Sequence, residues 1–301
     1  MSVSIGSAQV NERSAALRLL FHHLPADECR RRCAVTLAMI DSGELDPAGL
    51  FVARSRGDVV GVIIAAVLSG RGAAIWPPVA TSVSTADALV VVASEWLRGC
   101  GVRVAQALLD TADLSTAAPL LLHGFRHATA LWYLRHELEL ATDWLGRPER
   151  LTFTEYVESD AERFGAILVE TYDGSLDCPE VSGIRSPIEA IASHQSASAN
   201  MSQWWLAEWR GDPIGVLLVN AAADGDGWDV AYVGVVPAKR QRGYGRELMR
   251  KALFEAKAAG VPWLGLAVDA RNVPARALYK SLGFEPIECK EVVLAIWPEG
   301  G

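Results

Sequence analysis

The chain has 301 residues, of which 50% are hydrophobic and 21% are charged. This length predicts one large domain or two ordinary ones, and the composition excludes a largely disordered protein. With 28 basic against 36 acidic residues, the formal net charge is −8, which argues against a dedicated nucleic-acid binder.

Three further features predict a cytoplasmic protein without a membrane partner. The five cysteines, at positions 29, 33, 100, 178 and 289, are scattered and odd in number, which is typical of reduced thiols rather than a disulfide framework. Residues 1–13 lack the basic segment and apolar stretch of a signal peptide. The longest apolar run, Val59–Leu68, is far shorter than the ~20 residues that a membrane span needs.

In the first half, hydrophobic periodicity and turn signals predict alternating helices and strands. Helices are expected from Asn11 to Leu24, capped by Asn11, and from about Glu28 to Ile40, capped by Asp27. Further elements are expected in this order: strands Leu50–Ser55, Val59–Leu68 and Ala73–Val79, helix Ala86–Arg98, strand Val102–Leu109, helix Ser115–Leu122 and strand Ala128–Leu138.

The second half repeats this order of elements. It is expected to contain strand Leu151–Tyr156, helix Asp160–Thr171, a polar loop, helix Pro187–Gln195, strands Trp204–Trp209, Ile214–Asn220 and Trp228–Val236, helix Gly243–Ala259, strand Trp263–Val268, helix Val273–Leu282 and strand Pro286–Ile296. The residues repeat as well. The segment Arg56-Gly57-Asp58 recurs as Arg210-Gly211-Asp212, and Gly124-Phe125 recurs as Gly283-Phe284. Two tandem α/β domains follow, with a junction near Trp144–Arg150.

A basic loop with two glycines follows strand Trp228–Val236. Gly243 and Gly245 open the next helix, where unpaired N–H groups and a partial positive charge favour phosphate. A dinucleotide loop would need a third glycine at position 248, which is Leu248, and a Walker loop would need Lys-Ser/Thr after Gly245. A capped surface helix with solvated arginines is the remaining alternative. The basic residues around the glycines are Lys239, Arg240, Arg242, Arg246 and Arg250.

Two motifs in this half carry a resemblance to a known family. The pattern Arg240-x-x-Gly243-x-Gly245, after Val235-x-Pro237, resembles the coenzyme A loop of the GNAT N-acetyltransferase superfamily. The pattern Asn272-x-x-Ala275-x-x-Leu278-Tyr279-x-x-x-Gly283-Phe284 is similar to the second signature of that family. The resemblance implies an α/β fold of two tandem GNAT-like domains, each a mostly antiparallel twisted sheet flanked by helices. Residues 1–145 would be a degenerate copy, and residues 150–301 would be the acetyltransferase domain.

The resemblance also implies roles for single residues. Backbone groups of Gly234, Val235 and Val236 would pair with the pantetheine arm of acetyl-CoA and polarise the acetyl carbonyl. Asn272 would contact the pantetheine, and Tyr279 would lie beside the sulfur as a general acid, with packing on the sheet as its alternative role. Backbone N–H groups of a segment that we name the pyrophosphate loop would hold the pyrophosphate; it consists of Arg240, Gln241, Arg242, Gly243, Tyr244, Gly245 and Arg246.

The general base is less clearly indicated. Some family members carry a glutamate on the fourth strand, and counting back from the loop places Asp229 there. Others use the fifth strand, where this chain has Ala267. Asp229 also lies beside the turn Asp224–Gly227, so a solvated carboxylate at a strand edge is the alternative, and Glu208 is a weaker candidate for the base.

The polar loop Tyr172–Arg185 is expected to face the acceptor. It carries Asp173, Asp177 and Glu180, which would suit a cationic amine, although an ordinary polar loop is equally consistent with these residues. Cys178 is either a thiol contact or, more simply, an inert cysteine.

The first half lacks the cofactor motifs. Thr81–Thr85 stands in place of the glycine loop, Leu120 in place of Tyr279, and Asp113 in place of Asn272. We therefore expect a single acetyl-CoA site per chain. No metal site is expected, because His22, His23, Cys29 and Cys33 lack a Cys-x-x-Cys spacing.

The sequence thus predicts an acetyl-CoA-dependent N-acetyltransferase that acts on the primary amine of a small-molecule or peptide acceptor. The alternatives are a small-molecule acetyltransferase of the mycothiol synthase type, which shares the tandem layout, and a non-catalytic acyl-CoA sensor. Neither the acceptor nor the oligomeric state follows from the sequence.

Overall fold

The computed structural model describes residues 3–140, 150–195, 203–222 and 225–297. By its contacts the chain divides into two compact units, residues 1–128 with 291–301, and residues 129–290. The divisions fall within two 12-residue strands, β7 (Arg126–Glu137) and β13 (Glu285–Ile296), each of which starts in one unit and ends in the other. The junction that the sequence predicts at Trp144–Arg150 lies almost wholly outside the described residues.

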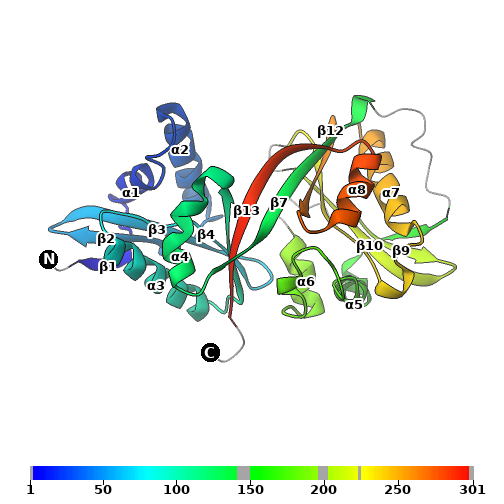
Figure 1. Ribbon diagram of the computed structural model, residues 1–301, viewed down its shortest axis with the longest axis horizontal. Helices are drawn as coiled ribbons and strands as arrows, with labels where there is room; N and C mark the ends of the chain where they lie inside the picture. The colour runs from blue at the N-terminus through cyan, green and yellow to red at the C-terminus, as the bar shows by residue number, and fades with distance from the viewer. Residues whose placement is uncertain (1–2, 141–149, 196–202, 223–224, 298–301) are drawn as a thin grey trace. The chain divides into compact units, whose positions relative to one another are not determined.

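The first unit is a sheet with helices on both faces (Figure 1). Helices α3 (Val83–Gly99) and α4 (Ala118–Leu122) pack on one face. Helices α1 (Arg13–Leu20) and α2 (Ala26–Ser42) pack on the other. Across the sheet the strands run β1 (Ser4–Ser7), β2 (Leu50–Ser55), β3 (Asp58–Leu68), β4 (Gly72–Ile75), β6 (Val104–Asp110) and β13, with β5 (Val79–Ala80) beside β3.

The central strand β3 shows why its sequence is a continuous apolar run. Ile63 and Ala65 point into the core under α3, and Val62 and Ile64 point into the core under α1 and α2. Successive strand residues face opposite sides, so a strand that is covered on both faces needs apolar residues at every position.

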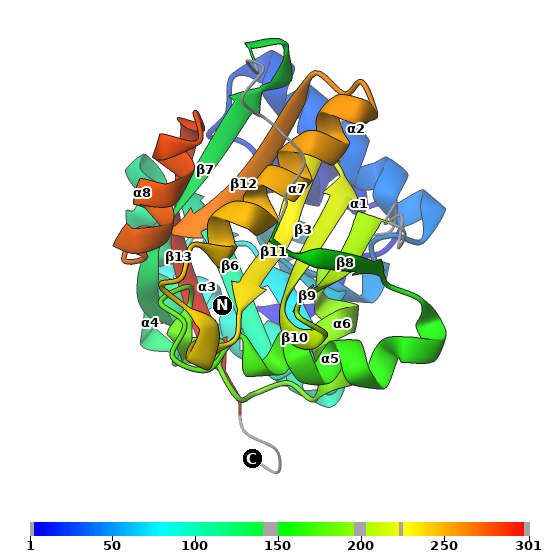
Figure 2. The ribbon, with the colours of Figure 1, turned by 90° about the vertical axis from the view of Figure 1, so that its right-hand side faces the viewer.

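The second unit repeats this architecture. Across its sheet the order is β7, β12 (Trp263–Asp269), β11 (Trp228–Val235), β10 (Asp212–Ala221), β9 (Trp204–Trp209) and β8 (Thr152–Glu155). Helices α7 (Tyr244–Ala258) and α8 (Val273–Ser281) cover one face, and Figure 2 shows α7 crossing the strands. Helices α5 (Ala161–Glu170) and α6 (Pro187–His194) cover the other.

Most strand pairs are antiparallel, among them β1–β2, β2–β3, β3–β4, β7–β12, β10–β11, β9–β10 and β8–β9, whereas β4–β6 and β11–β12 are parallel. This confirms the predicted α/β class with mostly antiparallel sheets. Shorter 3-10 turns lie at Pro47–Gly49, Thr111–Ala117, Leu138–Leu140, Glu158–Asp160, Pro179–Val181 and Pro237–Lys239.

The two copies share backbone geometry where they share sequence. The β2–β3 turn has Arg56 at φ +54° and Gly57 at φ +91°, and the β9–β10 turn has Arg210 at φ +54° and Gly211 at φ +84°. Two consecutive positive φ values are typical of a type I′ hairpin, which matches the twist of antiparallel strands. The repeated segment therefore encodes the same hairpin twice.

Several predicted boundaries were wrong for local reasons. Helix α1 begins after Glu12 rather than at Asn11, and α2 begins after Pro25 rather than at Asp27. The expected strand Ala73–Val79 is divided into β4 and β5 because Pro77 and Pro78 lack the N–H groups that a ladder needs. Strand β1 was missed because it is short and polar.

Among the helices of the described ranges, none has both the length and the apolar character of a membrane span.

The parallel pairing of β11 with β12 ends early. Within the described residues it runs from Trp228 beside Leu264 to Val230 beside Leu266. Beyond that point β11 pairs with β10 alone, up to Val235 beside Gly215. The far end of β11 thus has one edge without a strand partner, and this is where the site lies.

Candidate active site

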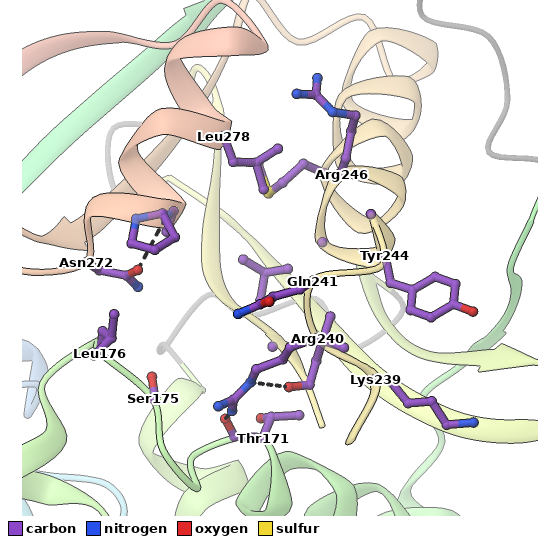
Figure 3. Close-up of a pocket in the computed structure, with 18 of the residues that line it drawn as sticks. Thr171, Ser175, Leu176, Lys239, Arg240, Gln241, Tyr244, Arg246, Asn272 and Leu278 are labelled. Atoms are coloured by element: carbon purple, nitrogen blue, oxygen red, sulfur yellow. Dashed lines mark hydrogen bonds between the residues drawn. The ribbon is translucent and has the colours of Figure 1, made fainter. Parts of the chain in front are cut away.

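A cavity of about 580 Å³ lies in the second unit at the end of β11 (Figure 3). Its walls are residues 232–235 of β11, the pyrophosphate loop with the start of α7, the start of α8, and the loop that follows α5. Among the residues expected to bind cofactor, the cavity is lined by Gly234, Val235, Arg240, Gln241, Gly243, Tyr244, Gly245, Arg246, Asn272 and Tyr279.

The pyrophosphate loop, which borders this cavity, contains backbone donors that have no partner among the described residues. Gly243 is the N-cap of α7 at φ +84° and provides no side chain to cap the helix. The N–H groups of Arg240 and Arg246 donate to the carbonyls of Pro237 and Gly243. The five N–H groups between them, at residues 241–245, make no hydrogen bond within the described part of the chain. Open donors at a helix start favour the binding of an anion.

The side chain of Arg240 does not point to the open donors. Its Nε donates to the carbonyl of Val235 at 3.0 Å, and its two Nη groups donate to the carbonyls of Gly174 and Thr171 at 3.0 and 2.9 Å. Figure 3 shows this guanidinium directed from the loop toward Thr171. Arg240 therefore ties the end of β11 to the end of α5, which holds two walls of the cavity together.

A further cation lies beside the loop that the sequence did not single out. Nη1 of Arg150 donates to the carbonyl of Arg242 at 3.1 Å, and its guanidinium lies 4.9 Å from the centre of the Tyr244 ring. Arg246 donates to the hydroxyl of Ser281 at 2.6 Å, and Lys239 lies 3.6 Å from the carboxylate of Asp212. No local pattern marks Arg150, because its partners lie about 90 residues away.

Tyr279, on α8, lines the cavity. The residue is 7% exposed, and its hydroxyl has no hydrogen-bond partner among the described residues. Burial raises the pKa of Tyr279, and the negative charge of Asp177 and the neighbouring Tyr232 raise it further. The phenol therefore keeps its proton at neutral pH, as a proton donor must.

Asn272 stands at the start of the same helix. It is the N-cap of α8, and its Oδ1 accepts a hydrogen bond from the N–H of Ala275 at 3.2 Å. The same side chain borders the cavity (Figure 3). The asparagine of the second motif thus fixes the helix that carries Tyr279.

Three expected site residues do not reach the cavity. The backbone N–H of Val236 donates to the carbonyl of Ile214 on β10, and the side chain of Val236 is buried. The N–H therefore points away from the open edge of β11. Arg242 is exposed outside the lining. Asp229 lies near the start of β11, beside Asn220 and Gly265, five residues before Gly234. At about 3.4 Å per strand residue, it is too far along β11 to contact the cavity end directly.

Gly265, the register partner of Asp229 on β12, leaves room for the Asp229 carboxylate. A Cβ on Gly265 would lie 2.3 Å from Oδ1 of Asp229, so any larger residue at position 265 would displace this carboxylate. Its register partner Asn220 lies against α6, since Nδ2 of Asn220 donates to the carbonyl of His194. Asp229 therefore shares the α6 face of the sheet, on the side opposite to α7 and α8.

Tyr232 and Thr171 form a pair at the cavity wall that the sequence did not indicate. Their hydroxyl groups lie 3.0 Å apart, and a Cβ on Gly234 would lie 2.5 Å from Oγ1 of Thr171. Burial raises the pKa of Tyr232.

Burial also raises the pKa of the Cys178 thiol to about 12, so this cysteine is not a nucleophile at neutral pH.

Comparison with known proteins agrees with these features. The acetyltransferase (GNAT) family model matches residues 168–284. The mycothiol acetyltransferase of Thermobispora bispora is 30% identical over 204 residues, which cover 62% of this chain and 68% of that protein.

Two solved structures share the fold across nearly the whole chain. A GCN5-related N-acetyltransferase from Sphaerobacter thermophilus superposes with a TM-score of 0.63 at 17% identity, covering 98% of this chain and 95% of its own. A tandem GNAT protein from the clavulanic acid biosynthesis pathway gives 0.55 at 16% identity, covering 98% of each chain. The chain therefore belongs to the GNAT family of acetyltransferases and has its tandem arrangement, as the two motifs predict.

Proposed function

We propose that the second unit binds acetyl-CoA in the cavity at the end of β11 and transfers the acetyl group directly to a primary amine of a small molecule or peptide. The observation that carries this proposal is the meeting of two features in one cavity. The five open N–H groups at residues 241–245 suit a diphosphate, and the buried phenol of Tyr279 suits a departing sulfur.

The residues of the cavity fit the cofactor. Bound acetyl-CoA would supply an acetyl group that is activated as a thioester. The pyrophosphate loop and Arg150 would hold the phosphates. The unpaired edge of β11 at Gly234 and Val235 would orient the pantetheine and stabilise negative charge on the acetyl oxygen. Asn272 fixes α8, and Tyr279 would donate its proton to the sulfur.

An amine attacks only when it is neutral, so an ammonium acceptor must first lose a proton. We propose Asp229 for this task, through water, because its carboxylate lies on the α6 face of the sheet in a space that Gly265 keeps free. The acceptor would then approach from the α6 face, opposite to the pyrophosphate loop. We further propose a cytoplasmic location, which suits a chain whose five cysteines form no disulfide in the described part of the structure.

The relatives of this chain favour one class of acceptor amine. The similarity to mycothiol acetyltransferases supports the amine form of mycothiol as the first compound to test. The first unit, in which the cofactor motifs are absent, would serve as a degenerate copy without a cofactor.

The test is release of the coenzyme A thiol from acetyl-CoA in the presence of single amines. The panel contains the amine form of mycothiol, aminoglycosides, polyamines and peptide N-termini, with the acetylated product identified by mass spectrometry. Turnover that requires one amine class supports the proposal and names the acceptor. Tight acetyl-CoA binding without turnover on any amine would favour the sensor and contradict it.

A further inference from the structure

Two segments that are about 90 residues apart face each other at the cavity. The first is the α5–α6 loop, residues 171–186, whose Gly174, Ser175 and Leu176 line one wall. The second is the junction between β12 and α8, which leads into Asn272 and Pro274 on the other wall.

A reciprocal pair of hydrogen bonds joins the two segments. Oδ1 of Asp177 accepts from the backbone N–H of Asp269 at 2.7 Å. In return, Oδ2 of Asp269 accepts from the backbone N–H of Cys178 at 3.1 Å. Because each carboxylate binds the backbone beside the other, the pair fixes both the separation and the rotation of the two segments.

Asp269 is the centre of this contact. The residue is 0% exposed, and its Oδ1 accepts from the hydroxyl of Thr129 at 2.6 Å and from the N–H of Arg271 at 2.8 Å. Burial by itself would raise the pKa of Asp269. The hydrogen bonds from Arg271, Thr129 and Cys178 outweigh burial and lower that pKa to about 2. A buried carboxylate with this many donors is held in one orientation.

Arg271 extends the contact to the far end of the loop. Its Nη2 donates to Oδ2 of Asp269 at 2.7 Å, and its two Nη groups donate to the carboxylate of Glu180 at 2.6 and 2.9 Å. Between these attachments Cys178 is held at φ +44°, a conformation that residues other than glycine adopt only when their surroundings impose it. The loop is therefore shaped by its contacts with the β12–α8 junction.

We propose that Asp177, Asp269, Arg271 and Glu180 form a clasp that positions the wall Gly174–Leu176 against the start of α8, with Asp269 as its positioning residue. This proposal extends the proposed function, and it depends on that function only in the measurements of acetyl-CoA binding and kinetics. The test must distinguish this clasp from a different role for Asp177, in which its negative charge acts on the acceptor amine.

Three substitutions separate these roles. Asp177→Asn removes the charge but retains Oδ1 as an acceptor for the N–H of Asp269, whereas Asp177→Ala removes both. Asp269→Asn replaces one acceptor oxygen with a donor that faces Cys178 or Arg271. Asp173→Ala, an exposed position in the same loop, is the matched control.

Two readouts apply to each variant, namely the dissociation constant for acetyl-CoA and the rate of tryptic cleavage after Arg185 in the same loop. We expect Asp177→Ala and Asp269→Asn to weaken acetyl-CoA binding about tenfold and to accelerate cleavage about tenfold. Asp177→Asn and Asp173→Ala should stay within about twofold of the wild type in both. Kinetic analysis should show a raised KM for acetyl-CoA with a smaller change in kcat for Asp177→Ala.

Other outcomes overturn the clasp. Equal loss in Asp177→Asn and Asp177→Ala would assign the role to charge. An unchanged rate of cleavage after Arg185 in Asp269→Asn would show that the α5–α6 loop keeps its conformation without the Asp269 carboxylate. If Asp269→Asn does not fold by circular dichroism, Glu180→Ala removes the exposed end of the clasp and must still accelerate cleavage. Because cleavage needs no cofactor, the clasp is tested even if acetyl-CoA does not bind.

Discussion

The hydroxyl oxygen of Ser82 accepts a hydrogen bond from the backbone N–H of Thr85 at 3.2 Å, in the first turn of α3. The corresponding helix of the second unit, α7, begins at Gly243, which has no side chain with which to cap it. The N–H of Arg246, which holds the corresponding place in α7, donates to the backbone carbonyl of Gly243 instead. A side chain therefore occupies the helix start in the first unit, whereas the second leaves it clear. This difference gives a physical reason why one copy would bind a diphosphate and the other would not.

The first prediction is therefore a stoichiometry of one acetyl-CoA per chain, measured by titration calorimetry. Burial of the pantetheine alone would leave the diphosphate of a second molecule without partners, and such burial is unfavourable. Ser82→Gly should leave this stoichiometry unchanged, because Thr81–Thr85 would still lack the second glycine and the basic residues of the pyrophosphate loop. Two molecules per chain would contradict the assignment of the first unit as a degenerate copy.

The second prediction concerns Gly245, which lines the cavity inside the first turn of α7. A Cβ at this position would lie 3.5 Å from Cδ2 of Leu278, an ordinary contact. Gly245→Ala should thus stabilise the fold by about 0.5–1 kcal/mol, since alanine favours helix. It should also weaken acetyl-CoA binding about tenfold, because the methyl group blocks close approach to the loop.

Thermal unfolding and calorimetric titration of the same variant check the two effects. Gly99→Ala at the end of α3, where an added Cβ meets nothing within 4 Å, is the matched control and should leave affinity unchanged. A Gly245→Ala variant of full affinity would remove the loop from the cofactor site.

The third prediction concerns Tyr279. Tyr279→Phe preserves the ring against Phe284, whose centroid is 6.0 Å away, but removes the proton. The value of kcat should fall by roughly 10²–10⁴, as is typical for a general acid, with little change in acetyl-CoA affinity. Tyr244→Phe is the control, because its hydroxyl points away from the cavity (Figure 3). Equal rates in the two variants would reduce Tyr279 to a packing residue.

The fourth prediction is a pH dependence of stability in the first unit. Hydrogen bonds from Arg54, at 2.6 Å to each carboxylate oxygen, lower the pKa of Glu12 from 4.5 to about 2. The folded state therefore binds this proton less readily than the unfolded state, so the pair contributes stability above pH 4.5 and loses it as the pH falls toward 2. Thermal unfolding midpoints of Glu12→Gln should fall less steeply across this interval than those of the wild type. Parallel slopes would show that the pair does not contribute.

The fold was largely predictable because its signals are local. Apolar runs such as Val59–Leu68, and glycine stops such as Gly283, marked the elements and their repetition. The boundary between the compact units was not predictable in this way. It depends on where the long strands β7 and β13 pair, and that pairing joins residues far apart in sequence.

The same distinction applies to the site. Gly243, Gly245, Asn272 and Tyr279 belong to local motifs, and the structure brings all four to one cavity. Asp269 and Arg271 were missed because their partners in the α5–α6 loop lie about 90 residues earlier.

The position along β11 separates two of the expected site residues from the cavity. Counting back from the loop placed Asp229 on β11, and the structure shows that it lies five residues before Gly234. Val236 was expected to pair with the pantetheine through its backbone, and its N–H donates to the carbonyl of Ile214 on β10.

The central claim is that the open N–H groups of the pyrophosphate loop hold the cofactor, and amide hydrogen exchange with and without acetyl-CoA measures this directly. Acetyl-CoA should slow exchange at residues 241–245, and at Val235, while exchange at Val83–Thr85 stays the same. Protection at the start of α3, or unchanged exchange across residues 241–245 at saturating acetyl-CoA, would contradict the account.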